Sequence, residues 1–180
     1  MTLVGILAHD RPAALVRCLL GLANLGGNYR VLIHMDNPTD EVVAVVALSG
    51  YASIRNDAEP LGPAGSVNQL LAHREAGEDF LRIDGDIEYV TPNSLVVMNE
   101  ALGEYACISP GRPTGVPWCD GMGPNTGLQP MGSAGTVGGT WLYRAEVIGA
   151  LGYFRHLRLL HNFEDSDYSS RLFHAGFRAA

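Results

Sequence analysis

The sequence predicts an α/β protein, a three-layer sandwich in which helices cover both faces of a mostly parallel central sheet. Residues 3–8 (LVGILA) form a continuous apolar run, which is typical of a parallel strand buried on both faces. Further strands are expected at 30–35 and 79–84, and segments with helical apolar spacing lie between them. Such strand–helix alternation over the first hundred residues favours parallel strands joined by crossover helices.

Length and composition fit a single globular domain over residues 1–180. A chain of this length can bury a substantial core. Apolar residues make up 47% and charged residues 17%, which excludes a disordered chain. The formal net charge of −7 argues against a nonspecific grip on nucleic acid or on an anionic membrane.

The first two helices are predicted from their starting residues. Asp10 is expected to cap the helix after the first strand, with Pro12 in its first turn. Asp40 is expected to cap the next helix, which runs to about Leu48. The apolar stripe of the first helix comprises Leu15, Cys18, Leu19, Leu22 and Leu25.

A short third strand is expected at 51–55, followed by a helix over about 65–76. After the strand at 79–84, Thr91 and Pro92 are predicted to start a helix that runs to about Leu102. The second half is less regular, and its expected elements are a strand at 105–109, a strand at 140–143, and helices from about 145 and over 164–175.

A long loop is expected in the second half. Fourteen of the 30 residues from 110 to 139 are Gly or Pro, which do not fit comfortably inside helices or strands. A loop of this length in a compact domain is usually functional or disordered. We therefore expect residues 110–137 to form a flexible lid or ligand-lining loop.

The most informative motif is Asp84-Gly85-Asp86, at the end of the fourth strand. Ligands gather at the carboxyl ends of strands in open α/β sheets. Two carboxylates this close repel each other unless a cation lies between them, and a divalent metal with oxygen ligands usually carries phosphates. The alternative is a simple polar turn, because Asp-Gly is common turn chemistry.

Several segments, taken in order, resemble a known family. The chain is similar to glycosyltransferases of the GT-A fold, in particular to the family-2 group of inverting, nucleotide-sugar-dependent enzymes. The resemblance covers nearly the whole chain, and the segments that carry it are 4–12 (VGILAHDRP), 31–40 (VLIHMDNPTD), 62–68 (GPAGSVN), 84–86 (DGD), 138–144 (GGTWLYR) and 162–171 (NFEDSDYSSR).

The resemblance implies a nucleotide-binding half over 1–102 and an acceptor and catalytic half over 103–180. It also implies a nucleotide-diphosphate sugar as donor, with a UDP-sugar favoured, and Mn²⁺ or Mg²⁺ as cofactor. Asp86 would bind the metal, while Asp84 would contact the ribose or the metal shell. Gly85 would allow the backbone to approach the nucleotide closely.

The same resemblance assigns catalysis to the acidic start of the last helix. Asp165 is the expected general base for the acceptor hydroxyl, with Glu164 beside it. The helix N-terminus favours its charged form, whereas the nearby acids Asp84, Asp86 and Glu164 would raise its pKa. The alternative is that these are ordinary first-turn acids of a helix.

The remaining donor contacts are also assigned by resemblance. Asp36 would bind the nucleobase, and its alternative is a strand-end turn residue. Asp10 is as easily a helix cap, and Arg11 would reach either a phosphate or only solvent. The full set expected to bind the sugar nucleotide is Ala8, Asp10, Arg11, Asp36, Asn37, Asn68, Asp84, Gly85, Gly138 and Gly139.

The sequence departs from the family pattern in three places. Val67 stands where many relatives have an arginine before Asn68, and no Gln-x-x-Arg-Trp motif follows, which argues against a processive synthase. Relatives usually continue past the last helix with a histidine that completes the metal site. Asp86 is therefore the firmest expected protein ligand.

Two other functions stay open at this stage. A nucleotidyltransferase would normally carry a glycine-rich basic loop after the first strand, which 8–12 (AHDRP) does not resemble. A non-catalytic nucleotide-sugar or glycan-binding module of the same fold is the other alternative. A Rossmann oxidoreductase is disfavoured because no GxGxxG follows the first strand.

The acceptor is left open by the sequence and includes saccharides, lipids, proteins and modified nucleic-acid bases. The start of the chain has no basic segment before its apolar run, and no run approaches a membrane span, so no signal peptide or transmembrane segment is expected. An odd count of three cysteines without metal-site spacing fits the cytoplasm, which is the expected compartment.

Overall fold

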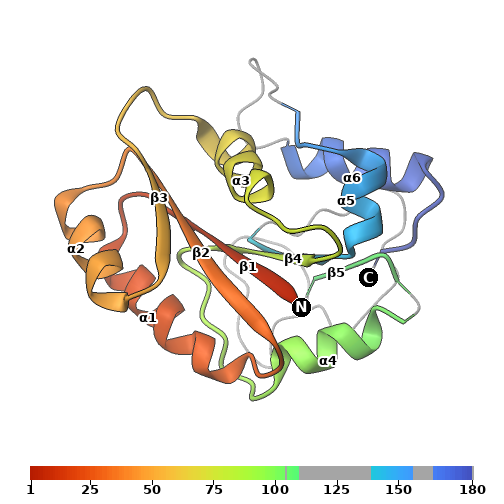
Figure 1. The fold of residues 1–180 in the computed structure, drawn as a ribbon, viewed down its shortest axis with the longest axis horizontal. Helices are drawn as coiled ribbons and strands as arrows, with labels where there is room; N and C mark the ends of the chain where they lie inside the picture. Colours follow the sequence, from red (N-terminus) through yellow and green to blue (C-terminus); the bar gives the residue numbers. More distant parts are fainter. Residues whose placement is uncertain (104, 110–138, 156–163, 180) are drawn as a thin grey trace, which may run out of the picture.

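The protein is described from a computed structural model over residues 1–103, 105–109, 139–155 and 164–179. Its described strands form one six-stranded sheet in the order β3-β2-β1-β4-β6-β5 (Figure 1). The first four positions are parallel, whereas β6 pairs antiparallel with both β4 and β5. The strand bounds are β1 Thr2–Ala8, β2 Tyr29–Asp36, β3 Ala52–Asn56, β4 Asp79–Asp84, β5 Cys107–Ile108 and β6 Thr140–Tyr143.

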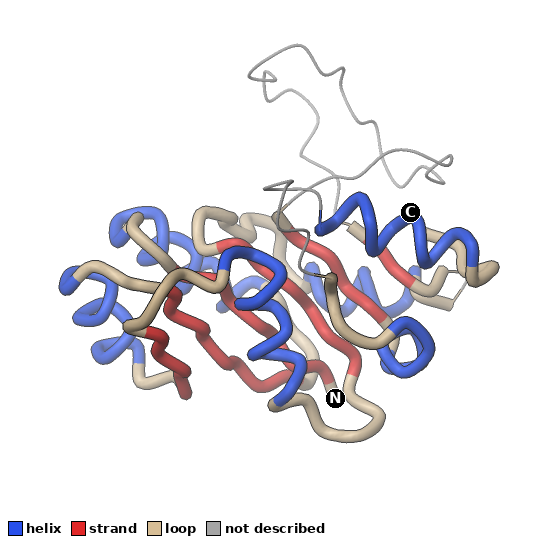
Figure 2. The backbone as a smooth tube through the Cα atoms, turned by 90° about the horizontal axis from the view of Figure 1, so that it is seen from above, coloured by secondary structure: helices blue, strands red, loops and turns tan. Residues whose placement is uncertain are grey.

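Helices cover both faces, which confirms the predicted three-layer α/β sandwich (Figures 1 and 2). The helix bounds are α1 Pro12–Gly21, the 3-10 turn η1 Leu22–Asn24, α2 Asp40–Ser49, α3 Gly62–Ala72, α4 Ser94–Ala101, α5 Ala145–Leu151 and α6 Glu164–His174. Among the described residues, no helix combines the length and the apolar character that crossing a bilayer requires.

The handedness of the connections explains which helices cover each face of the sheet. The chain moves from β1 to β2 to β3 in one direction along the sheet and then returns past β1 to β4. Because parallel crossovers are right-handed, the reversal places α3 on the opposite face from α1 and α2. The core is accordingly split into two apolar clusters, one under α1, α2 and α4 and one under α3, α5 and α6.

The strand alternation decides which side chains reach each cluster. In β1, Val4 and Ile6 belong to the cluster under α1, whereas Leu3 belongs to the cluster under α3. All three are fully buried. Side chains two residues apart in a strand share a face, so Arg82 and Asp84 of β4 lie on the same face as Phe80, beside α3 and α6.

The predicted helix caps were wrong in three places. Helix α1 begins at Pro12 after Arg11, and no side chain caps it, so Asp10 is not the cap. Thr39 rather than Asp40 caps α2, because its Oγ1 accepts a hydrogen bond from the Val42 amide at 3.4 Å. Thr39 has the extended backbone conformation of a cap, which the residue types alone do not reveal.

The third correction concerns α4. It begins at Ser94 after Asn93, whose φ of 59° is left-handed, rather than at Thr91 and Pro92. The carbonyl of Thr91 instead accepts a hydrogen bond from the Ser94 hydroxyl at 2.5 Å. Helix α3 also begins earlier than predicted, at Gly62, because the Gly62 amide donates a hydrogen bond to the Asp36 carboxylate.

Candidate functional site

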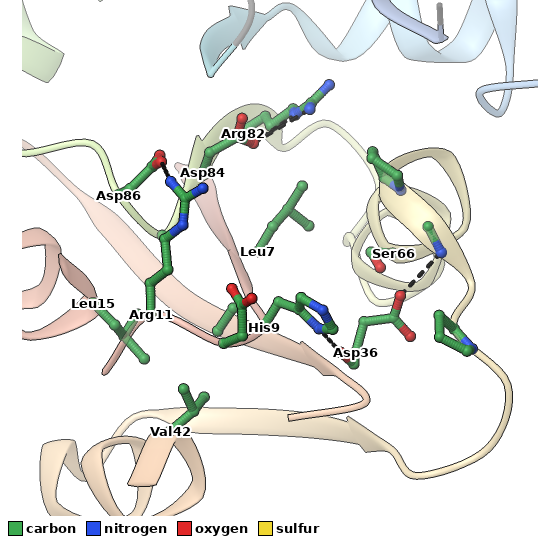
Figure 3. A pocket seen from close by; sticks show the side chains of 16 residues that line it. Leu7, His9, Arg11, Leu15, Asp36, Val42, Ser66, Arg82, Asp84 and Asp86 are labelled. Carbon is green, nitrogen blue, oxygen red and sulfur yellow. Dashed lines mark hydrogen bonds and ion pairs between the residues drawn. The ribbon is translucent and has the colours of Figure 1, made fainter. Parts of the chain in front are cut away.

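The carboxyl ends of β1, β2 and β4 border a cavity of about 490 Å³ (Figure 3). Strand β1 lies between β2 and β4, which is the point where the chain reverses direction along the sheet, and ligands bind at such points in open α/β folds. The cavity gathers six of the ten residues predicted to bind a sugar nucleotide, together with the predicted metal ligand Asp86. The six are Ala8, Asp10, Arg11, Asp36, Asp84 and Gly85.

The backbone of the Asp84–Asp86 turn is fixed against the neighbouring strands. The amide of Asp84 donates to the Gly139 carbonyl at 2.7 Å, and the amide of Gly85 donates to the Leu7 carbonyl at 2.8 Å. A Cβ atom at position 85 would lie 2.6 Å from that Leu7 oxygen, so only glycine fits. Gly85 is thus required by its contact with β1, besides lining the cavity.

A buried arginine that the sequence analysis overlooked lies beside Asp84 (Figure 3). Arg82 is 2% exposed, and its Nε and Nη2 each lie 3.3 Å from Asp84 Oδ1. Its Nη1 donates to Asp165, and its Nη2 lies 3.4 Å from Glu164 Oε1. One guanidinium therefore connects the acid at the end of β4 with both predicted catalytic acids at the start of α6.

The signal for Arg82 was present in the sequence. It stands two residues before Asp84 in the same strand, so the period-2 alternation of a strand directs both side chains to one face. The cation expected from the sequence was a metal between Asp84 and Asp86. In the structure, Arg82 supplies a positive charge to Asp84 and Glu164.

Burial and charge shift the pKa values of this cluster. Burial raises the pKa of Asp165 to about 6, the Arg82 guanidinium opposes the shift, and Glu164 and Asp84 add to it. Burial also raises the pKa of Asp84, again against the effect of Arg82. The direction for Asp165 agrees with the effect expected from its acidic neighbours, but burial is the larger cause.

Asp86 has a different partner, which comes from the other side of the cavity. Its Oδ2 accepts a hydrogen bond from Arg11 Nη1 at 2.7 Å, and Figure 3 shows the arginine reaching across to it. The side chains of Arg11 and Asp86 are 70% and 42% exposed. Ion pairs this exposed contribute little stability, so the pair opens easily.

Asp36 lines the cavity, but its carboxylate already serves the start of α3. Oδ1 accepts from the Asn56 amide at 2.7 Å and from the Leu61 backbone at 3.0 Å, and Oδ2 accepts from the Gly62 amide at 2.9 Å. His9 Nδ1 donates to the Asp36 carbonyl (Figure 3). Asp36 therefore acts as a strand-end turn residue, which was the alternative to base recognition. Its contact with a nucleobase stays a prediction.

Three described residues of the predicted sugar-nucleotide set are not among those that line the cavity: Asn37, Asn68 and Gly139. The Asn68 side chain exchanges two hydrogen bonds with the Phe154 backbone, at 2.8 and 2.9 Å, and so joins α3 to the segment after α5. Asn37 has a left-handed φ of 47°, and its amide donates to the Asn56 carbonyl at 2.8 Å. Their predicted contacts with the sugar nucleotide stay predictions.

The glycine pair is only partly described. Gly138 and the expected loop 110–137 lie outside the described residues. Gly139 has a φ of +106°, and a Cβ atom there would lie 3.2 Å from Ile87 and 3.8 Å from Asp84 Oδ2. A glycine at 139 thus keeps space beside the second oxygen of Asp84.

The carboxylates of Asp84 and Asp86 are the available metal donors. Oxygen ligands of this kind suit Mg²⁺ and Mn²⁺. In the ranges that the structure describes, no group of three His, Cys, Asp or Glu side chains gathers to hold a metal ion. Two carboxylates form only part of the oxygen shell that such an ion takes, and substrate phosphates commonly supply further ligands.

At the sequence level, no protein-family model and no curated protein matches this chain. Solved structures do match its fold. S. aureus TarS 1-349 has a TM-score of 0.70 and 18% identity, with 94% of this chain and 54% of that chain covered. The mannosyltransferase PcManGT from Pyrobaculum calidifontis, in complex with GDP-Man and Mn²⁺, has a TM-score of 0.74 and 16% identity, with 99% and 53% covered.

A third structure of another enzyme class also matches. CMP:2-keto-3-deoxy-manno-octonic acid synthetase, complexed with CTP, has a TM-score of 0.56 and 10% identity, with 99% of this chain and 88% of that chain covered. The present chain spans about half the length of TarS 1-349 and of PcManGT. The fold is thus the nucleotide-sugar transferase fold, GT-A, that the sequence predicted.

Proposed function

We propose that this GT-A domain transfers a glycosyl group, a hexosyl unit or a related sugar, from a nucleoside-diphosphate sugar to an acceptor hydroxyl with inversion. The observation that carries the proposal is the link that Arg82 makes between the acidic end of β4, which lines the cavity, and Asp165 at the start of α6, which is not among the lining residues. Asp84 and Asp86 end β4, and Asp165 is joined to that strand end through Arg82. The acids proposed to act at the leaving group, Asp84 and Asp86, are thereby linked to the acid proposed to act at the acceptor, Asp165.

The proposed base is Asp165. A general base works best when its pKa is near the operating pH, and burial brings the pKa of Asp165 to about 6. It is then ionised at neutral pH while remaining basic enough to accept a proton. Glu164 is 7% exposed and contacts the same Arg82 guanidinium as Asp165. Its proposed role is to add a second negative charge beside that guanidinium.

The diphosphate side of the reaction belongs to the cavity wall at the end of β4. Asp86, with Asp84 beside it, would hold Mn²⁺ or Mg²⁺, which neutralises the charge of the departing nucleoside diphosphate. Arg11 is the exposed cation at that place and would turn from Asp86 to a phosphate oxygen once Asp86 is occupied. Gly85 and Ala8 form the adjacent wall.

The PcManGT structure, with its GDP-Man and Mn²⁺, supports a sugar nucleotide and a divalent cation as ligands here. The preference for a UDP-sugar rests on the resemblance of the sequence alone. The cytoplasm remains the proposed compartment, and the free thiols of Cys18 and Cys107, both buried, are compatible with it.

Thermal unfolding with a panel of nucleotide sugars, with and without Mn²⁺, tests this proposal. Ligand stabilisation grows with the ratio of concentration to dissociation constant, so a matched donor at a hundredfold excess over Kd adds about 2.7 kcal/mol. We expect one class of donor to raise Tm, and Mn²⁺ to increase that shift. The Asp86→Asn variant is the control that should lose the metal-dependent part. No shift with any nucleotide sugar would exclude the proposal.

The shared fold with the CMP-sugar synthetase favours a nucleotidyltransferase as the second candidate. That activity would release pyrophosphate from a nucleoside triphosphate and a free sugar. A coupled pyrophosphate assay over the four triphosphates separates it from glycosyl transfer, which releases a nucleoside diphosphate instead. A binding module without catalysis would bind a donor but neither transfer nor hydrolyse it.

A further inference from the structure

Arg82 is the most unusual charged group in the described part of the molecule. It stands in the central strand β4, its side chain is 3% exposed, and three carboxylates contact it. Removing a charge from water is costly unless partners replace the lost hydration. Asp84, Glu164 and Asp165 supply those partners, and they come from two elements far apart in the sequence.

The geometry of the guanidinium divides its donors between the two elements. Nε faces Asp84 alone, Nη1 donates to Asp165, and Nη2 lies between Asp84 and Glu164, at 3.3 and 3.4 Å. An arginine fork has fixed donor directions, so it orients what it binds. Every described contact of the fork is with a carboxylate, although Arg82 also borders the cavity.

The carboxylates around Arg82 also keep its guanidinium charged. Burial opposes the charged guanidinium, but Asp84, Asp165 and Glu164 raise the pKa of Arg82, which therefore stays positively charged. It is the fixed cation of the cluster, in contrast to Arg11, whose side chain is 70% exposed. A fixed cation with three acidic partners is suited to hold a side chain in place.

We propose that Arg82 is a positioning residue, which holds the Asp165 carboxylate in place for proton abstraction and ties it to the strand end that bears Asp84 and Asp86. This inference rests on the proposed glycosyl transfer and adds a residue to it that no sequence motif assigned. Arg82 acts through Asp165 and not through the donor. Catalytic groups displaced by about 1 Å lose much of their rate advantage, so loss of Arg82 lowers turnover.

A double-mutant cycle with Arg82→Met, Asp165→Asn and the double variant tests the inference. In the presence of the donor class found by thermal unfolding, we expect Arg82→Met to lower kcat about 100-fold, the lower range for loss of a general base. Donor Kd from calorimetry should change less than threefold. Because residues that act as a unit are non-additive, the double variant should be no slower than Asp165→Asn alone.

The same variants have a readout that needs no ligand. Arg82→Met leaves buried carboxylates without their cation, which lowers Tm. Replacing Asp165 by Asn in that background removes one of these charges, so Tm should recover in part. Arg82→Lys keeps the charge without the fork. It should fold like the wild type and retain donor binding, but its turnover should fall at least tenfold. If Arg82→Met does not fold, Arg82→Lys alone tests the positioning role.

Several results would overturn the inference. Additive losses of kcat in the cycle would mean that Arg82 does not act through Asp165. A donor Kd weakened more than tenfold in Arg82→Lys or Arg82→Met would make Arg82 a donor ligand instead. Failure of the wild type to bind any sugar nucleotide would remove the proposed function itself, and it is distinguishable because it is seen before any substitution is made.

Discussion

Asp165 combines two properties that usually exclude each other in a carboxylate: it is paired with a cation and it has a raised pKa. The ion pair with Arg82 favours the charged form, but burial outweighs this and raises the pKa to about 6. The residue thus keeps a fixed position and has a pKa that suits the proposed general base. Such a combination is characteristic of functional sites.

The pH dependence of turnover follows from that shift. The base works only when ionised, and its pKa is raised from 3.8 to about 6, so kcat should fall as the pH drops through about 6. The measurement is a pH profile at saturating donor. The residual rate of Asp165→Asn should lack this acidic limb, and a wild-type limb near pH 4 would contradict the assignment.

Arg11 gives a second prediction at this scale. It occupies Asp86 through an exposed ion pair of the kind worth about 0.2–1 kcal/mol. Arg11→Ala should therefore tighten Mn²⁺ binding in the absence of nucleotide by about 1.4- to 5-fold, while weakening the binding of the nucleotide sugar.

Both affinities of the Arg11→Ala variant can be measured by calorimetry. Arg17→Ala, at an exposed arginine of α1, the helix that follows Arg11, is the matched control. A variant with unchanged affinity for the metal and for the donor would show that Arg11 touches neither.

At the scale of elements, the turn after β4 depends on its contact with β1. At the end of strand β4, the Asp84 amide donates a hydrogen bond to the Gly139 carbonyl, and the Gly85 amide donates one to the Leu7 carbonyl. Both contacts are backbone to backbone, so the position of the acidic turn is set by the sheet rather than by side chains. The turn is thereby rigid before any ligand arrives.

Gly85→Ala should consequently destabilise the fold. Its Cβ would lie 2.6 Å from the Leu7 oxygen, and overpacking of this kind costs about 1–3 kcal/mol. Urea unfolding provides the measurement. Gly149→Ala in α5 is the matched control, because nothing lies within 4 Å of its Cβ, and it should be neutral or stabilising by up to about 1 kcal/mol.

The elements also show what a sequence can and cannot predict. The strands β1, β2 and β4 were located because local apolar patterns mark them, whereas their order in the sheet was not predicted. The insertion of β6 between β4 and β5 was not predicted, because antiparallel pairing across a long stretch of chain leaves no local pattern. Thr39 and Asp40 show the same limit at a cap, where two adjacent residues are equally suitable by type.

The site divides along the same line. Asp84, Gly85 and Asp86 were predicted from one contiguous motif, and the structure brings them to the cavity. Arg82 was missed because its importance depends on α6, which lies far along the sequence. Asn68 was assigned by resemblance, whereas its amide holds the Phe154 backbone. Local patterns predict elements, but partners from distant elements decide what a polar side chain does.

At the scale of the whole molecule, an aromatic cluster fastens α6, the helix of the base, to the sheet. Tyr168 is 1% exposed, its ring stacks on Phe154 at 4.0 Å, and it meets Tyr143 of β6 edge-on at 5.4 Å. Its hydroxyl donates to the Gly152 carbonyl at 3.2 Å. The position of Asp165 therefore depends on packing as well as on Arg82.

Tyr168→Ala should lower both stability and turnover. Loss of a buried aromatic ring costs about 3–5 kcal/mol, and the freed helix would misplace the base. Tyr168→Phe is the control, since it loses only one hydrogen bond, about 1 kcal/mol, and should keep its activity. Chemical denaturation and steady-state rates measure the two effects. Full activity of a folded Tyr168→Ala protein would show that the cluster does not position α6.

The two pairings of β4 have a consequence for how the protein folds. The partners Ile6 and Ile83 of β1 and β4 are 77 residues apart in the sequence, and the partners Ile83 and Thr140 of β4 and β6 are 57 residues apart. Both pairings are therefore non-local, and the loop-closure entropy of each is lost before contacts compensate for it. In a refolding experiment, nucleotide binding and catalytic competence should consequently return together, and a stopped-flow comparison of a fluorescent nucleotide with turnover would measure both. Recovery of nucleotide binding before turnover would mean that the two halves of the sheet form in separate steps.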